Sequence, residues 1–363
     1  MAETYIQMFQ EEFYPKIFFE IAKDTIRQYV EREEQITKQL ESKLNHYMEQ
    51  LVELQKKDLD MTVAEIDISF LYTSLEEGKA RFRIDSYGEG SRILEESMAT
   101  DYLAADWLTV NLERLTEKLS ECAADEGLRR YIRPAEIETL KLRAVRSLLY
   151  YFSFRFKYAI REALDLKRLA KVKKADNFAI QIGEYMDWQK TIYAILPEVD
   201  VFNCDADTDF RFRRFPAIYY QNKQFEDLTM NQSRFVDCTF TDTIIENCRM
   251  NDCIFDHCTF DNVKVYETQM KGCSFIGCMI SNTVFEKSVF YSEEPDHGEI
   301  EYYEPVEFYK CAFSSDCFRE CAMQYCLVSG CDAKEVKIAD CNTEESGFQK
   351  LGHMDAEQEN REE

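Results

Sequence analysis

The side chains that most often carry chemistry are few or scattered in this chain. It has four histidines, and none of them lies in a metal-binding or nucleophile motif: His46, His257, His297 and His353. A catalytic pair of carboxylates cannot be singled out among 69 acidic residues. We therefore expect a protein that is not an enzyme and that uses no cofactor and no metal ion.

One glycine-rich stretch, Gly88-Glu89-Gly90-Ser91, falls between an expected strand and an expected helix, where phosphate-binding loops occur. It lacks the third glycine and the lysine of such loops. A plain turn with Ser91 as the helix cap is the favoured interpretation. The hypothesis of an enzyme in the N-terminal half, with the repeat as its regulator, would rest only on this stretch and on the hairpin expected before it.

Cysteine is the most abundant reactive side chain that follows a pattern. Of the fourteen cysteines, eleven fall in two series, from Cys238 to Cys278 and from Cys311 to Cys341; within each series they are separated by five residues or by multiples of five, never by the C-x2-C spacing of a zinc ribbon. We expect these thiols to be compact buried hydrophobic groups in a reducing compartment, and we rank metal or redox chemistry second.

Residues 141–174 carry eleven bases against two acids, Glu162 and Asp165, and are rich in aromatic residues. Such a segment could bind an anionic partner, or its bases could pair with acidic helices of the same domain or form a solvated face. A direct nucleic-acid partner is not expected, because the whole chain has a net charge of -25. The candidate partner-binding bases are Arg143, Arg146, Arg155, Lys157, Arg161, Lys167, Arg168 and Lys171.

Apolar residues return at every fifth position over residues 210–290. The series is Phe210, Phe215, Tyr220, Phe225, Met230, Phe235, Phe240, Ile245, Met250, Phe255, Phe260, Val265, Met270, Phe275, Ile280, Phe285 and Phe290. A period of five fits neither a helix nor a strand, so the chain must turn within every repeat. Turn-forming Asp or Asn residues follow many of the large ones, at positions 227, 237, 242, 247, 252, 262 and 282.

The segments Ser233-Arg234-Phe235-Val236-Asp237, Cys238-Thr239-Phe240-Thr241-Asp242 and Cys258-Thr259-Phe260-Asp261-Asn262 closely resemble the pentapeptide-repeat family. The resemblance implies a right-handed quadrilateral β-helix with twenty residues per coil. Stacking at that period predicts cysteine columns, which are Cys238/Cys258/Cys278, Cys253/Cys273, Cys311/Cys331 and Cys321/Cys341.

The five-residue spacing of large residues ends at Phe290. It resumes at Phe308 and continues to Ile338. The seventeen residues between 291 and 307 contain seven acids and no Lys or Arg, so we expect an acidic insertion. Five of its acids are further candidate partner-binding residues, namely Glu293, Glu294, Asp296, Glu299 and Glu301. The β-helix should span residues 201–343 in about six coils, followed by an acidic disordered tail over 344–363.

Residues 1–200 form the other expected domain, and the fold class is α+β with two domains. Pro15 fits the first turn of a long helix that ends near Asp58. Alternating apolar residues predict a β-hairpin over 64–86. Further helices are expected over 91–124, 134–175 and 177–195.

The start of the chain lacks a basic segment followed by an apolar run, and no eighteen consecutive residues are apolar. We expect a bacterial, cytoplasmic protein without membrane contact. The favoured function is a protein–protein interaction scaffold or adaptor, and a chaperone or adaptor for a secreted toxin is one form that it could take. A homodimer through the helical domain or an end of the β-helix is a further hypothesis.

The alternative function comes from the family resemblance. Some pentapeptide-repeat proteins are acidic rods that look like DNA and inhibit or protect topoisomerase (gyrase). Outside the insertion, the coils here carry 15 acids and 13 bases, which leaves little phosphate-like charge. DNA mimicry therefore ranks second.

Overall fold

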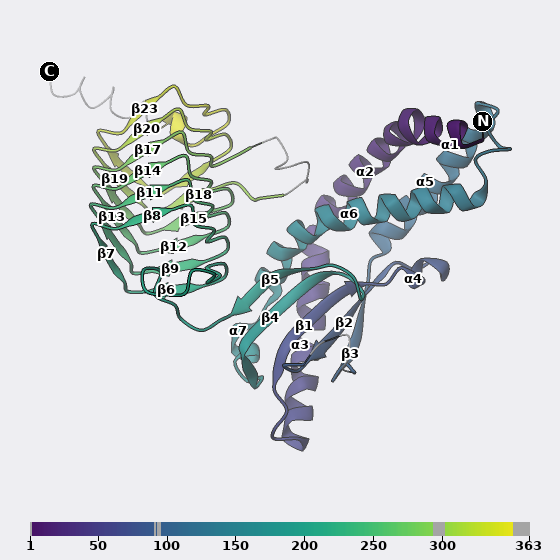
Figure 1. Ribbon diagram of the computed structural model, residues 1–363, viewed down its shortest axis with the longest axis horizontal. Helices are drawn as coiled ribbons and strands as arrows, with labels where there is room; N and C mark the ends of the chain where they lie inside the picture. The colour runs from purple at the N-terminus through teal and green to yellow at the C-terminus, as the bar shows by residue number, and fades with distance from the viewer. Residues whose placement is uncertain (1, 91, 93–95, 293–301, 351–363) are drawn as a thin grey trace. The chain divides into compact units, whose positions relative to one another are not determined.

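The computed structural model describes residues 2–90, 92, 96–292 and 302–350 (Figure 1). The chain divides into two compact units, Met1–Ala194 and Ile195–Glu363. Each unit has its own buried apolar core.

The first unit combines helices with one mixed sheet. Its helices are α1 (Ala2–Met8), the π-helical turn η1 (Phe9–Phe13), α2 (Tyr14–Glu31), α3 (Glu33–Lys57), α4 (Thr73–Glu76), α5 (Asp106–Asp125), α6 (Pro134–Ala163) and α7 (Leu166–Leu169). Its strands are β1 (Val63–Phe70), β2 (Arg81–Tyr87), β3 (Thr100–Ala104), β4 (Lys174–Glu184) and β5 (Gln189–Ile195).

The long helix expected between Pro15 and Asp58 is two helices. Arg32 leaves the helical region, with φ -112° and ψ 6°, and separates α2 from α3. The apolar spacing continues across this break, because Tyr29 and Ile36 are both buried in the same core. The apolar residues of the sequence did not indicate this interruption, and Val30, expected on the buried side, is 47% exposed.

The expected hairpin is present, since β1 and β2 pair antiparallel with Ile68 opposite Ile84. It is part of a larger sheet with the strand order β3-β2-β1-β4-β5, in which β1 and β4 are parallel. The helix predicted over 177–195 was wrong, because these residues lie in β4 and β5. The helix predicted over 91–124 was wrong at its start, because β3 precedes α5.

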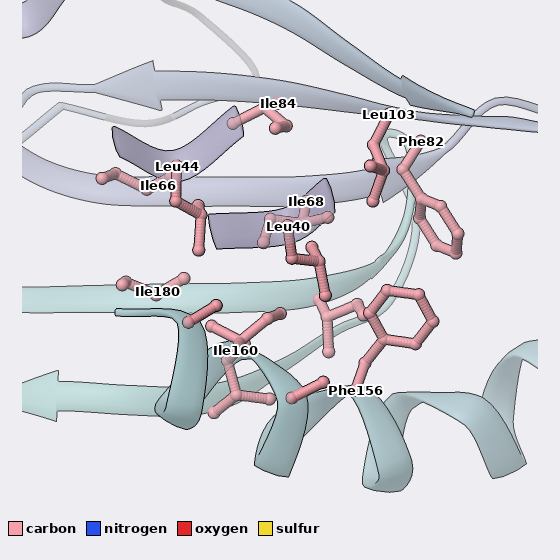
Figure 2. Close-up of a cluster of buried hydrophobic side chains, with 14 of the residues drawn as sticks. Leu40, Leu44, Ile66, Ile68, Phe82, Ile84, Leu103, Phe156, Ile160 and Ile180 are labelled. Atoms are coloured by element: carbon pink, nitrogen blue, oxygen red, sulfur yellow. The ribbon is translucent and has the colours of Figure 1, made fainter. Parts of the chain in front are cut away.

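Helices α3 and α6 supply much of the core against the sheet. Figure 2 shows Leu40 and Leu44 of α3 and Phe156 and Ile160 of α6 among side chains from β1, β2, β3 and β4. The aromatic run within 148–160 is helical, as the helix predicted over 134–175 required, although that helix ends at Ala163. The first half of α6 packs instead with α2 and α5 in a second apolar cluster that includes Leu140.

The second unit is a stack of coils. Among its described residues, eighteen short strands form three parallel six-stranded sheets, ordered β22-β19-β16-β13-β10-β7, β23-β20-β17-β14-β11-β8 and β21-β18-β15-β12-β9-β6. Isolated parallel bridges such as Thr229↔Arg249 form the fourth side. Phe235 pairs with Phe255, so one coil takes twenty residues.

The strands of these sheets have three residues each. They are β6 (Arg214–Pro216), β7 (Tyr219–Gln221), β8 (Gln224–Glu226), β9 (Arg234–Val236), β10 (Thr239–Thr241), β11 (Ile244–Glu246), β12 (Ile254–Asp256), β13 (Thr259–Asp261), β14 (Lys264–Tyr266), β15 (Ser274–Ile276), β16 (Met279–Ser281), β17 (Val284–Glu286), β18 (Glu307–Tyr309), β19 (Ala312–Ser314), β20 (Cys317–Arg319), β21 (Leu327–Ser329), β22 (Asp332–Lys334) and β23 (Lys337–Ala339).

The corners of the coils use left-handed backbone. Asp237, Asp242 and Asn262 have φ of 54°, 50° and 54°, in a region where Asp and Asn are tolerated better than most residues. All seven turn formers named from the sequence have positive φ. Each three-residue side therefore ends in a corner that redirects the chain onto the next sheet.

The large residues fill the shaft, as the period predicted. Phe235, Phe255 and Phe275 are all 0% exposed. The rings of Phe255 and Phe275 stack with centroids 4.8 Å apart and planes 10° apart. Phe275 then stacks on Phe308 at 4.5 Å, although the two are thirty-three positions apart, so the insertion adds thirteen residues to one coil without breaking the column.

The predicted cysteine columns are present, and two of them form one ladder. Cys278 and Cys311 lie at equivalent positions of adjacent coils, so the ladder runs Cys238, Cys258, Cys278, Cys311 and Cys331. The thiol of Cys258 donates to the carbonyl of Phe235, with 3.4 Å between Sγ and O. All fourteen cysteines of the chain are free thiols.

The shaft does not end at residue 343. Phe348 lies in the segment expected to be a disordered tail, yet it is 0% exposed and packs against Phe308, Phe313 and Phe318. At the other end Phe202 contacts Tyr220 and Phe225. Each end of the stack is thus covered partly by the chain itself.

Replacing Phe255 with Ala should lower the free energy of unfolding of the second unit by about 3–5 kcal/mol, because the substitution opens a cavity between stacked rings. Circular dichroism during denaturant unfolding measures the effect. Thr259→Ala on the outer surface of the same coil is the control and should change stability little. Equal stabilities of Phe255→Ala and the wild type would contradict the inward placement of the ring.

Candidate interaction surfaces

The basic segment named from the sequence does not form one patch. Arg155 of α6 turns toward α3, where its Nη2 atom donates to both carboxylate oxygens of Glu33 at 3.1 and 3.0 Å. Its guanidinium also lies 5.5 Å from the ring centre of Tyr29. Because this arginine joins two helices within the unit, only 12% of its side chain is exposed.

Other bases of the segment also make internal contacts. Lys157 is fully buried, and its Nζ atom lies 4.5 Å from the ring centre of Tyr158. Arg146 lies near Glu184 and Asp187, with N–O distances of 3.8 and 3.7 Å. These contacts favour the alternative that the bases answer acids of their own domain.

The remaining candidates lie elsewhere on the unit. The guanidinium of Arg143 is 5.7 Å from the ring centre of Tyr14, and Arg168 pairs with Glu49. Arg161 is half-buried, whereas Lys167 and Lys171 are exposed. The candidates Glu293, Glu294, Asp296, Glu299 and Glu301 lie outside the described residues, as does Ser91, the expected helix cap.

A polar cluster on the sheet was missed by the sequence reasoning. Arg83 pairs with Asp85 (Nε to Oδ2, 2.7 Å), and Thr100 donates from Oγ1 to Asp85 Oδ1 at 2.7 Å. Asp67, opposite Asp85 in the sheet, accepts from Arg92 at 3.3 Å. Asp67 and Asp85 are 3% and 0% exposed, although alternation along β1 and β2 places them away from the apolar core.

Burial is the main cause of the altered pKa of Asp67 in this cluster. It raises the pKa of Asp67 to about 7, the neighbouring Glu65 acts in the same direction, and Arg92 acts in the opposite one. The arrangement can hold a proton on a carboxyl group near neutral pH. A carboxyl group with such a pKa can serve as an acid or a base.

The contribution of Asp67 to the stability of the first unit should therefore fall as pH rises. An acid whose folded pKa lies above its unfolded value of 3.8 stabilises the fold fully at lower pH, and this contribution is lost between about pH 4 and 7. Asp67→Asn should make the dependence of unfolding free energy on pH shallower, because the amide cannot ionise. Both tryptophans, Trp107 and Trp188, lie in this unit, so their fluorescence during denaturant unfolding measures it.

The control for this measurement is Asp60→Asn, which alters an exposed carboxylate in the turn after α3. It should keep the wild-type dependence on pH. If Asp67→Asn also kept it, Asp67 would not hold the proton inferred here.

Five of the six strands of one sheet of the second unit present almost no charge outward, and we name this surface the low-charge face; the sixth strand, β22, carries Asp332 and Lys334 outward and is not part of it. The low-charge face consists of the outward residues of β7, β10, β13, β16 and β19, which are Tyr219, Gln221, Thr239, Thr241, Thr259, Asp261, Met279, Ser281, Ala312 and Ser314. Its one charged residue, Asp261, accepts from Ser281 Oγ at 3.0 Å and from Asn282 Nδ2 at 3.1 Å. Tyr219 and Met279 are 59% and 57% exposed.

The neighbouring faces carry more charge. On the sheet that contains β8, β11, β14, β17 and β20, the outward residues include Glu226, Glu246, Lys264, Glu286 and Arg319. On the sheet that contains β9 and β12, Arg234 pairs with Asp256 at 2.7 Å. Charge is therefore distributed unevenly around the coils, and counting outward positions at a period of twenty would have located the low-charge face from the sequence.

The first unit has open hollows on its surface. Two adjoining ones, of about 430 and 510 Å³, run along the second half of α3 and share Leu54 and Met98. In the part of the chain that the structure describes, no group of three or more His, Cys, Asp or Glu side chains is arranged to hold a metal ion.

Each coil of the second unit has four sides of five residues. Strands of adjacent coils pair twenty residues apart, and the corners have left-handed backbone. The second unit is a pentapeptide-repeat β-helix. No family model and no curated protein matches the chain. The assignment of the fold rests on the strand register.

Solved structures similar to the pentapeptide-repeat β-helix were found, and 28 chains match. One is HetL, a pentapeptide-repeat protein involved in heterocyst differentiation regulation from the cyanobacterium Nostoc sp. strain PCC 7120, at 8% identity, TM-score 0.15, 36% of this chain and 87% of that one. Another is full-length QnrB1, a plasmid-mediated fluoroquinolone resistance protein, at 12% identity, TM-score 0.11, 40% of this chain and 96% of that one.

Within the described residues, we find no helix whose length and hydropathy would let it cross a lipid bilayer.

Proposed function

We propose that this protein is a non-enzymatic scaffold for protein–protein interaction, with the low-charge face as a docking surface for another protein. The observation that carries the proposal is the segregation of charge around the β-helix. In a chain with 31% charged residues, the outward positions of β7, β10, β13, β16 and β19 include one charged residue, Asp261.

The chemistry of this face fits a protein partner. The central parts of protein interfaces are depleted of charged residues, because desolvating an unpaired charge is costly. Thr239, Thr241 and Thr259 offer methyl groups and hydroxyls that lose little side-chain entropy when they are covered. The exposed rings and thioethers of Tyr219 and Met279 supply apolar area at either end of this row.

The β-helix also gives the face a fixed shape. Inward residues such as Phe240 and Phe260 stack with planes 3° apart and centroids 4.9 Å apart directly behind the low-charge face. Because these rings hold the backbone of β10 and β13, the outward threonines do not need to be ordered on binding. A preorganised surface binds with a smaller entropic cost.

The proposal also includes a cellular role and a second partner for this scaffold. The scaffold acts as an adaptor in the bacterial cytoplasm, with the first unit binding a second partner, and a chaperone or adaptor role for a secreted toxin fits this arrangement. The basic residues Lys167 and Lys171 and the acidic insertion are the surfaces proposed for that second contact. Self-association through the first unit or an end of the β-helix belongs to the same proposal.

DNA mimicry with inhibition or protection of gyrase is the alternative. A DNA mimic needs a regular series of acids along its surface. Here acids on the β-helix are interspersed with bases, and pairs such as Arg234–Asp256 and Arg319–Glu286 neutralise them. A supercoiling assay with purified gyrase separates the two functions, since a scaffold should leave supercoiling unchanged.

Thr239→Lys should weaken partner binding by at least about tenfold, because it places an unpaired charge on the low-charge face, beside Thr259. The partner is first captured from lysate with the wild-type protein, and its purified form is then titrated against each variant by calorimetry. Stability should be unchanged, because Thr239 points outward.

The matched control is Ile244→Lys in the same coil, on β11. Ile244 is also outward-facing and 38% exposed, but it lies on the more charged sheet. It should retain wild-type affinity. Equal loss in both variants, or no loss in either, would exclude the low-charge face as the docking surface.

A further inference from the structure

Strand β3 lies at one end of the sheet of the first unit, and no other described strand pairs with its outer edge (Figure 1). Ala105, directly after β3, donates from its backbone N to Ala80 O at 2.8 Å. Hydrogen bonding alternates along an antiparallel pair, so every second residue of β3 bonds to β2 and the others point away from it. The N–H and C=O groups of Thr100, Tyr102 and Ala104 therefore face the outer edge, which we name the β3 edge.

A side chain occupies the centre of the β3 edge. Tyr102 N donates to Asp101 Oδ1 at 2.7 Å, and Lys43 Nζ of α3 lies 2.9 and 3.1 Å from the two oxygens of this carboxylate. The carboxylate thus stands where the carbonyl group of a neighbouring strand would accept. An open strand edge is a template for the backbone of another chain, and here Asp101 competes for one of its donors.

The two hollows along α3 open beside the first residue of the β3 edge. Thr100 lines one of them together with Met98 and Ala99, the residues that lead into β3. The opposite wall is one face of α3, and Leu54 of this helix belongs to both hollows, as does Met98. An extended chain on the β3 edge would have these hollows, of about 430 and 510 Å³, next to its side chains.

Acids outnumber bases in the lining of the hollows. Arg168 pairs with Glu49, and Lys56 pairs with Glu53, yet the two acidic side chains remain 60% and 64% exposed. Lysine or arginine on an incoming chain would therefore meet carboxylates that water still reaches. The ionisable residues of the lining are Glu49, Glu53, Asp58, Asp60, Lys57 and His46.

We propose that the β3 edge and the two hollows bind an extended, basic segment of another protein, which adds to the sheet as a strand. Backbone bonds to Thr100, Tyr102 and Ala104 supply affinity, and basic side chains that enter the hollows supply selectivity. This surface lies on the first unit. It gives the scaffold proposed above a contact that does not involve the low-charge face.

A second copy of this chain fits the β3 edge less well. An antiparallel pairing centred on Tyr102 is the register that joins all three edge residues to their symmetry mates. It would bring Asp106 of one copy opposite Met98 of the other, beside the acidic hollows, and like charges repel. Helix α5 also begins at Asp106, so it would meet the wall of α3. A basic segment of a partner protein meets neither obstacle.

Titration of the full-length protein with a labelled peptide of alternating lysine and valine tests the proposal. Fluorescence anisotropy should show saturable binding, and hydrogen exchange with mass spectrometry should show slower exchange of residues 98–104 in the complex. The same peptide with methylated backbone nitrogens cannot add to a strand edge and should not bind. Equal binding of the two peptides, no binding of either, or protection that excludes residues 98–104 would overturn the proposal.

Tyr102→Pro tests the backbone contact. Proline removes the central N–H of the β3 edge but keeps the bonds between β3 and β2, to which this N–H does not contribute. Affinity for the lysine–valine peptide should fall by at least about tenfold. An affinity equal to that of the wild type would contradict strand addition.

Charge reversal tests the recognition without altering the strand. Glu53→Lys with Asp58→Lys should weaken binding of the lysine–valine peptide by at least about tenfold and let a glutamate–valine peptide bind. Glu121→Lys with Asp125→Lys makes the same change at exposed positions of α5 and should keep wild-type affinity. Thr239→Lys should keep it too, so this proposal and the low-charge face fail independently. Loss of binding in either control, or none in the charge reversal, would overturn the proposal.

Discussion

The stacking of inward side chains at a period of five is the interaction on which the second unit depends. A three-residue strand cannot stabilise itself, so each coil gains its stability from the coils on either side. The columns Phe235–Phe255–Phe275–Phe308 and Phe240–Phe260 supply continuous contact along the shaft. The left-handed corners make this stacking possible, because they return each side to the same place one coil later.

The stacking of inward side chains does not determine the residue types at the outward positions. An outward residue contributes little to the shaft, so its type can serve binding. The same reasoning explains why the insertion after Phe290 is tolerated: it leaves at a corner, and Phe308 returns to the column above Phe275. The unequal charge of the faces is therefore a property of the surface and is not required by the fold.

The sequence was sufficient to predict the β-helix because its signal is local and repeated. Phe, Met and Cys mark the inward positions, and Asp or Asn marks many corners. The first unit was harder to predict. The strands β4 and β5 were assigned to a helix, although Phe178, Ile180 and Ile182 alternate, because β4 pairs with β1 more than a hundred residues away and nothing local shows this pairing.

The candidate sites also depend on contacts between distant parts of the chain, which the sequence does not show. Composition identified the basic segment, but the direction in which each base leaves α6 decides its contacts, and Arg155 points to Glu33 on another helix. The burial of Asp67 had no sequence signal, since a strand with Glu65, Asp67 and Ser69 on one side is typical of a solvent-facing surface. The low-charge face was accessible from the sequence once the twenty-residue register was known, because the register decides which outward residues share a sheet.

Hydrogen exchange of backbone amides, resolved by coil, tests most directly whether the shaft holds the second unit together. If stacking between coils is the source of stability, amides of β12, β13 and β14 in the middle of the stack should exchange slowest and with similar rates, through opening of the whole stack. Exchange in these strands as fast as in residues 198–210, before the first coil, would contradict the account.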